Sequence, residues 1–188
     1  MKILWFSHRD IKHPKAGGAE RTIFEVGKRL AARGHQFYNI SVQWKGSPIE
    51  DEIEGVHIIR LKNNVIAHFQ TPILLRQFDY DVVIDDLGHA VPWFSEYFSK
   101  KNGVVFFRHL HARSLKGQVS FPLRIMITDL EKMYPLIYRK WTFITESNSS
   151  IDDLNNLGID KKRIFKIPPG VDTNFFRPGK KTDFPSII

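Results

Sequence analysis

Short apolar runs alternate with segments of helical periodicity along the 188 residues of the chain. Apolar runs of strand length lie at 2–6, 37–42, 56–61, 82–84, 104–107, 142–145 and 164–167. Helical segments lie between them, at 19–33, 65–78, 90–101, 121–139 and 148–157. Several runs are apolar throughout, which is typical of strands covered on both faces. The alternation predicts an α/β fold with a doubly wound, mainly parallel Rossmann-like sheet and helices on both faces.

The composition indicates one domain without disulfide bonds. Hydrophobic residues make up 42% of the chain and charged residues 26%, and there is no cysteine, which excludes disulfides and thiolate metal sites. No apolar run approaches the length that crosses a bilayer, and charged residues enter the N-terminus before a signal peptide could form. We therefore expect a cytoplasmic location, with the inner face of the membrane as an alternative.

The chain is basic, with a formal net charge of +8. Excess positive charge favours anionic partners, although the lysines and arginines are scattered and most fit a solvated surface. One hypothesis is therefore a non-catalytic basic α/β module that binds phosphate-rich ligands or an anionic membrane surface.

The end of the chain lacks regular structure signals. Pro168-Pro169-Gly170 and, further on, Pro178-Gly179 break any helix or strand. This composition predicts a domain over residues 1–169 and a hinge or linker over residues 170–188.

The first apolar run leads through a polar loop to Gly17 and Gly18, where a helical pattern begins. The first turn of a helix has amides without intrahelical partners and a partial positive charge. Adjacent glycines allow a ligand to approach the backbone closely. This unit, Gly17, Gly18 and the first turn of the helix that follows, is called the glycine corner. It predicts a binding site for a phosphate or carboxylate, with a tight turn that holds no ligand as the alternative.

Two common nucleotide-binding motifs are absent. The glycine loop lacks the G-x-G-x-x-G spacing, and residues 40–44, which end the second run, contain no acidic residue for a ribose. The G-x-x-x-x-G-K-[ST] loop of P-loop proteins is also absent. The glycine corner is therefore neither an NAD site nor a P-loop.

Four ordered stretches carry a resemblance to a known family. They read GGAER at 17–21, LAARGH at 30–35, VVFFRH at 104–109, and FITES at 143–147 followed by LGI at 157–159 and IFKIPPGVD at 164–172. The chain resembles the N-terminal half of a GT-B glycosyltransferase of family 4, also called group 1.

The resemblance implies a retaining enzyme that moves a hexose from a nucleotide-sugar to an acceptor across a cleft between two Rossmann-like domains. The first domain binds the acceptor, a saccharide or a lipid-linked molecule, and the second holds the donor and carries an E-x7-E element. The second domain is missing here, so we expect this half to be inactive alone. The resemblance implies no metal, no other cofactor and no nucleic-acid partner.

The resemblance also implies roles for individual residues. Gly17, Gly18 and Ala19 would bind the donor phosphates, and His109 would act as the catalytic residue that orients the reacting sugar. Glu146 and Ser147 lie where the family has a short Ser-Glu motif, here in reversed order, and would line the cleft.

Further polar residues follow the predicted strands and are candidates for the acceptor side of the cleft. They are His8, Arg9, Asp85, Asp86 and His111. The two aspartates either bind acceptor hydroxyls or cap the next helix. The histidines, His89 among them, fit a sugar-binding cleft better than a zinc site, because no H-E-x-x-H helix accompanies them.

The segment 113–141 is both basic and apolar. Three consecutive apolar residues, Ile125 to Ile127, favour a helix packed in the core, with peripheral membrane contact as the alternative. Pro135 is expected to kink or break this helix.

Overall fold

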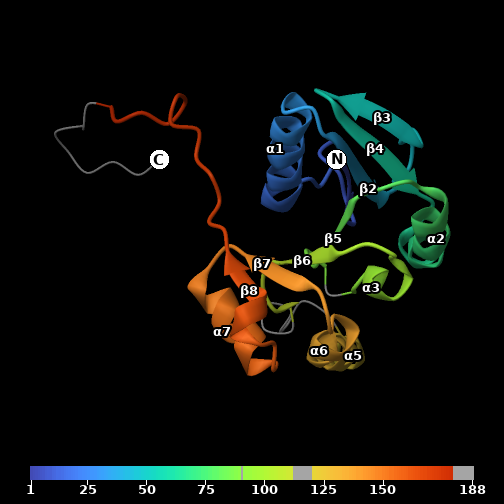
Figure 1. The fold of residues 1–188 in the computed structure, drawn as a ribbon, viewed down its shortest axis with the longest axis vertical. Coiled ribbons are helices and arrows are strands. Elements are labelled where there is room, and N and C mark those ends of the chain that lie inside the picture. Colours follow the sequence, from blue (N-terminus) through green and yellow to red (C-terminus); the bar gives the residue numbers. More distant parts are fainter. Residues whose placement is uncertain (90, 112–119, 180–188) are drawn as a thin grey trace.

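The computed structural model describes residues 1–89, 91–111 and 120–179, and eight strands in these ranges form one sheet (Figure 1). The strands are β1 (Lys2–Phe6), β2 (Gln36–Val42), β3 (Glu50–Ile53), β4 (Val56–Leu61), β5 (Val82–Asp86), β6 (Gly103–Phe107), β7 (Thr142–Thr145) and β8 (Ile164–Lys166). Their order is β3-β4-β2-β1-β5-β6-β7-β8, and every neighbouring pair is parallel except β3 and β4. The predicted doubly wound α/β fold is confirmed.

Strand β3 was not anticipated from the sequence. It is an antiparallel edge strand joined to β4 by a turn in which Glu54 and Gly55 both have positive φ, 48° and 78°. Its residues Glu-Asp-Glu-Ile carry three charges, and acidic side chains on an edge strand discourage pairing with a further chain. A strand of this kind lacks the apolar pattern that reveals a buried one.

The helices are α1 (Gly18–Ala32), α2 (Asn64–Gln77), α3 (Ser95–Phe98), α5 (Phe121–Lys132), α6 (Tyr134–Ile137), α7 (Asn148–Asn156) and the 3₁₀ turn η1 (Lys161–Arg163). The helix expected over 90–101 is reduced to the single turn of α3, and residue 90 lies outside the described residues. The segment 121–139 is broken at Met133, just before Pro135, as expected.

The helices cover the two faces of the sheet unequally (Figure 1). On one face, Ile23 and Phe24 of α1 pack with Ile3 and Trp5 of β1. On the other, α2, α6 and α7 bury Leu75, Ile137 and Leu154 against a cluster that contains Leu4 and Phe6. Successive residues of β1 thus alternate between the two cores, as a strand covered on both faces requires.

Two glycines define how α1 sits on the sheet. A Cβ on Gly27 would lie 2.6 Å from the ring of Phe37, so the missing side chain lets α1 approach β2 closely. Gly34 has φ of +83° and follows the C-cap Arg33, the position at which glycine commonly ends a helix.

Helix α5 differs from the sequence-based expectation. We expected core packing, yet Ile125 and Met126 are 44% and 56% exposed, and only Ile127 and Glu131 of this helix are buried. The expectation was wrong because consecutive apolar residues cannot all face one core in a helix. The first residues of the basic segment, 113–119, lie outside the described residues.

The chain leaves the sheet after β8. The amide of Ile167 donates to the Thr145 carbonyl at 2.8 Å, and residues 168–179 are exposed and extend away from the sheet (Figure 1). The rest of the linker predicted over 170–188 lies outside the described residues. In the described part of the chain, no helix combines the length and apolar character needed to cross a membrane.

Candidate functional site

The candidate residues lie at one edge of the sheet, where β1, β5, β6 and β7 end. Between β1 and β5 the strand order reverses, because β2 continues from β1 in one direction while β6 and β7 continue from β5 in the other. In open α/β sheets, ligands bind in the crevice at such a switch point. The glycine corner, His8 and Asp85 all border it.

The backbone of Gly18 in the glycine corner borders open space among the described residues. Gly17 is the N-cap of α1, and its amide donates to Oε2 of Glu20 at 2.7 Å. A Cβ on Gly18 would have no heavy atom of the described residues within 4 Å. Helix geometry leaves the amides of Gly18 and Ala19 without intrahelical acceptors. The amides of Gly18 and Ala19 are therefore available to a ligand. The amide of Gly17 is already bonded to the Glu20 carboxylate.

The loop between β1 and α1 is anchored through a buried ion pair. Asp10 accepts from Nε and Nη2 of Arg60 in β4 at 2.8 and 2.9 Å, and from Oγ of Ser41 in β2 at 2.9 Å. The side chains of Asp10 and Arg60 are wholly buried. A pair in this two-pronged geometry fixes the loop against two strands and so positions the glycine corner.

Arg108 joins several of the elements at the site. Its Nη2 and Nε donate to the Asp86 carboxylate at 2.8 and 3.2 Å, and Nη2 lies 3.3 Å from the Ala19 carbonyl of α1. Its Nη1 lies 3.6 Å from Oε2 of Glu146, at the end of β7. Sequence reasoning missed Arg108, although it is the charged residue directly after β6, at the same edge of the sheet as the other candidates.

The two candidate aspartates are engaged within the protein. Asp86 is 2% exposed and also accepts from Nε1 of Trp5 and the amide of Gly88. Asp85 accepts from the Ser95 amide, the first of α3, at 3.2 Å, which matches the capping alternative. Burial raises the pKa of Asp85 to about 7.

The candidate histidines fall into two pairs. The rings of His8 and His89 have centroids 4.4 Å apart, and those of His109 and His111 are 4.7 Å apart. His111 is anchored, because its amide donates to Oε1 of Glu131 at 2.5 Å and its Nε2 lies 3.1 Å from the Gly88 carbonyl. His109 is exposed at the end of β6, and partial burial lowers its pKa. His109 is therefore the more accessible of the two.

The remaining candidates have local partners. Ser147 is the N-cap of α7 and accepts from the Ser150 amide at 3.1 Å. Arg9 donates from Nη1 to the Lys15 carbonyl at 3.2 Å within the loop. Among the described residues, no group of three His, Asp or Glu side chains is arranged to hold a metal ion.

Comparison with known proteins identifies the family. The family model described as Glycosyltransferase Family 4 matches residues 16–175, and the chain belongs to this family. Its fold is similar to that of sucrose-phosphate synthase from Thermosynechococcus elongatus, with a TM-score of 0.67 and 18% identity. The similarity covers 95% of this chain and 50% of that one, so this chain spans about half of that structure. No curated protein sequence gives a significant match. The family resemblance read from the sequence is confirmed.

Proposed function

We propose that this chain is the acceptor-binding half of a retaining glycosyltransferase that moves a hexose from a nucleotide-sugar to an acceptor. Family membership supports glycosyl transfer. The observation that carries the finer proposal is the unfilled first turn of α1, where the backbone beside Gly18 is open and borders the switch point.

The chemistry of the leaving group explains why this turn matters. As the glycosidic bond breaks, negative charge develops on the nucleoside diphosphate, and a helix N-terminus stabilises such charge by about 0.3–1 kcal/mol when exposed and more when buried. The amides of Gly18 and Ala19 are the donors we assign to the phosphates. The carboxylate of Glu20 holds the Gly17 amide and would repel a phosphate placed there.

His109 fits a positioning contact with the transferred sugar. Because its pKa is lowered by partial burial and by neighbouring His111, we propose that His109 stays neutral at pH 7 and offers hydrogen bonds without a charge. A retaining transfer of this kind requires no strong protein base, and we propose no metal or other cofactor.

We further propose that a second lobe supplies the donor pocket and that this half is inactive alone, in a cytoplasmic setting. The similarity to only half of the sucrose-phosphate synthase chain supports the proposed second lobe. The test is a transfer assay with radiolabelled UDP-, GDP- and ADP-hexoses, on the 188-residue chain and on a longer form that contains a second lobe. We expect turnover, with retained anomeric configuration, only in the longer form.

Two other outcomes would reject the proposal. One is a longer form that binds no nucleotide-sugar. The other is tight, salt-sensitive binding of inorganic phosphate by the short chain together with an inactive long form, which would favour the non-catalytic basic module.

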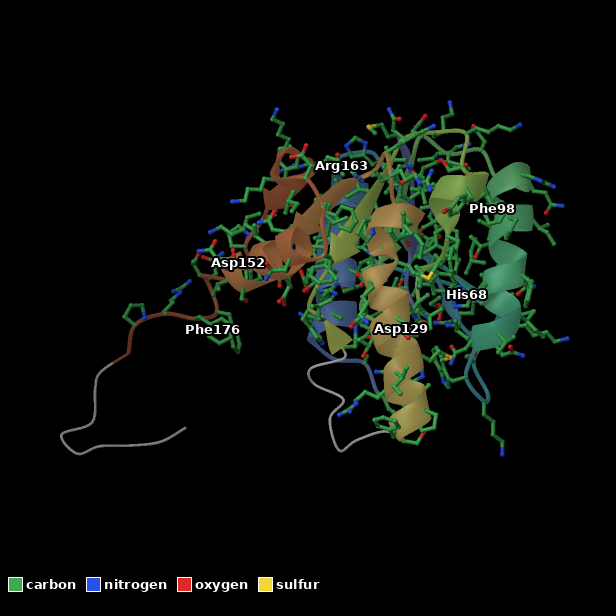
Figure 2. The ribbon with its side chains drawn as sticks, turned by 90° about the horizontal axis from the view of Figure 1, so that it is seen from below. His68, Phe98, Asp129, Asp152, Arg163 and Phe176 are labelled. Carbon is green, nitrogen blue, oxygen red and sulfur yellow. The ribbon has the colours of Figure 1, made fainter. Side chains whose placement is uncertain are left out.

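The exposed faces of α2 and α5 favour a second proposal, peripheral contact with a membrane that carries anionic lipid. Both helices lie on the side of the sheet opposite α1 (Figures 1 and 2). Their large exposed apolar residues are Val65, Ile66, Phe69, Ile73, Phe121, Leu123, Ile125 and Met126. Arg76, Lys132 and Arg139 lie on or beside these helices and are exposed, which suits an anionic surface.

Vesicle sedimentation tests this contact. We expect binding to vesicles of equal parts phosphatidylglycerol and phosphatidylcholine, and much weaker binding to phosphatidylcholine alone. Phe69→Ser and Met126→Ser should each weaken binding several-fold. The control, Ile49→Ser, removes a residue that is 64% exposed beside the edge strand β3 and should leave binding unchanged. Equal binding by all three variants would reject the contact.

A further inference from the structure

The side chain of Arg108 reaches the first turn of α1 from β6, which lies two strands away from β1 in the sheet. Arg108 directly follows β6 and continues the alternation of Phe106, which packs in the core beneath α1. Its guanidinium carbon lies 4.7 Å from the centroid of the Phe106 ring. The alternation of side chains along β6 thus directs a cation toward the glycine corner.

The carboxylate of Asp86 holds this guanidinium in one orientation. Nε and Nη2 of Arg108 donate to its two oxygens at 3.2 and 2.8 Å. Asp86 is itself fixed, because Nε1 of Trp5 and the amide of Gly88 donate to the same carboxylate at 3.2 and 2.7 Å. A Cβ on Gly88 would lie 2.8 Å from Oδ1 of Asp86, so the missing side chain permits this close approach. A two-pronged pair fixes the plane of the guanidinium, which a single contact would not do.

This orientation brings Arg108 to the backbone of the glycine corner. Nη2 also donates to the Ala19 carbonyl at 3.3 Å, and Ala19 supplies one of the two amides that we assign to the donor phosphates. The remaining nitrogen, Nη1, lies 3.6 Å from Oε2 of Glu146. The Arg108 side chain is only 9% exposed, so it acts on the corner mainly through Ala19.

We propose that Arg108 is a positioning residue for glycosyl transfer, which holds the first turn of α1 so that its amides point at the departing diphosphate. This inference rests on the proposed function, because it takes the diphosphate to bind at the glycine corner. Donors stabilise a developing charge best when their direction is fixed before the charge appears. The cation also lies against the positive end of the helix and therefore adds to its attraction for the diphosphate.

The main chain of Arg108 is anchored separately from its side chain. Oγ of Ser150 in α7 donates to the Arg108 carbonyl at 2.7 Å. This bond does not involve the guanidinium. A variant that replaces only the side chain therefore keeps the attachment between β6 and α7.

Amide hydrogen exchange of the 188-residue chain tests the positioning without any ligand. The Arg21 amide donates to the Gly17 carbonyl at 3.0 Å in the first turn of α1, and the Arg33 amide donates to the Leu30 carbonyl at 3.0 Å at the other end. In Arg108→Met we expect the Arg21 amide to exchange about tenfold faster and the Arg33 amide to keep its rate. A general loss of stability would instead speed exchange at both ends of the helix.

Steady-state kinetics of the longer form, which contains a second lobe, test the role in transfer. Arg108→Met should lower kcat about 100-fold and change the KM of the nucleotide-sugar less than about threefold, because the charge develops only in the transition state. Arg108→Lys keeps the charge, but a single ammonium group cannot hold Asp86 in a two-pronged pair and reach Ala19 as well. We therefore expect the lysine variant to recover no more than about a tenth of the wild-type kcat.

Arg163 provides the matched control, because it is also an arginine that packs on a phenylalanine ring and bonds to a backbone carbonyl. Its guanidinium carbon lies 5.8 Å from the centroid of the Phe143 ring, and its Nε donates to the Trp141 carbonyl at 3.1 Å. Trp141 directly precedes β7, so this contact lies at the edge of the sheet opposite the glycine corner. Arg163→Met should leave both the exchange rate of the Arg21 amide and kcat unchanged.

Three results would overturn the role of Arg108 alone. They are an unchanged exchange rate of the Arg21 amide in Arg108→Met, a wild-type kcat in Arg108→Lys, and an equal loss of kcat in Arg108→Met and Arg163→Met. Failure of the proposed function gives a different result. A longer wild-type form that binds no nucleotide-sugar would reject the glycine corner, and the role of Arg108 with it.

Discussion

The hydroxyl of Tyr138 donates to Oδ2 of Asp85 at 2.8 Å, and both side chains are wholly buried. The Ser95 amide is a second donor to the same oxygen, yet burial outweighs these bonds and raises the pKa of Asp85 to about 7. A carboxyl group at the C-terminal edge of β5 is thus held in the core, where its proton affects the stability of the fold.

We expect the contribution of Asp85 to the free energy of unfolding to fall as the pH rises from about 4 to about 7. In this range the folded protein keeps the Asp85 proton that the unfolded chain, with a pKa of 3.8, has lost. The unfolded state therefore binds fewer protons, and the free energy of unfolding decreases with pH, by on the order of 4 kcal/mol in total. Urea unfolding of the wild type and of Asp85→Asn, at pH 4 to 8, measures the free energy of unfolding of each. The difference between the two curves should change across this range and level off above pH 7; parallel curves would contradict the assignment.

Gly18→Val should abolish transfer without loss of folding. A Cβ at this position meets no described heavy atom within 4 Å, so the fold has room, while the side chain would occupy the approach to the first-turn amides. We expect the melting temperature to change little and turnover, measured with the second lobe present, to fall at least 100-fold. The control is Gly179→Val, which also adds a side chain in open space, far along the exposed tail. Full activity in Gly18→Val would remove the phosphate role.

Arg60→Met should destabilise the protein by about 3–5 kcal/mol, because it leaves the buried Asp10 carboxylate without its cation. Adding Asp10→Asn should restore part of the loss, since the remaining group is then neutral. Arg29→Met, which removes a partly exposed pair with Glu25 on α1, should cost less than about 1 kcal/mol. Urea unfolding compares the variants, and a loss in Arg60→Met no larger than that in Arg29→Met would show that the ion pair does not hold the loop.

His109→Ala should lower turnover through lost positioning of the sugar. The residue is exposed, so the melting temperature should stay within a degree or two of the wild type. We expect the loss to fall mainly on kcat, by about 10- to 100-fold, in an assay of the two-lobed form. His35→Ala, at the opposite edge of the sheet, is the matched control. An unchanged kcat in His109→Ala would assign this histidine to structure.

The buried strands were readable from the sequence because their signal is local. The runs at 2–6, 56–61 and 142–145 match β1, β4 and β7 to the residue. Apolar and β-branched residues gathered within four to six positions suffice to identify these strands. The acidic edge strand β3 carries no such signal. The exposure of Ile125 and Met126 depends on which elements pack against α5, and this information lies elsewhere in the chain.

The positions of several candidate residues were predictable, because they depend only on where each strand ends. The rule that polar residues after parallel strands share one edge places His8, Asp86 and His109 correctly at that edge. The partners of these residues were not predictable. Arg60 lies 50 residues from Asp10, and Arg108 lies 22 residues from Asp86. Pairings over such separations depend on strand order, which the sequence pattern alone leaves open.

The alternation of side chains along β1 limits how the length of this strand can change. His8 and the loop that leads to α1 both follow this single five-residue strand. Inserting or deleting one residue there would exchange the two faces and move His8 and the glycine corner out of place together. We therefore expect the length of β1 to stay constant among related chains, while the loops beside it vary.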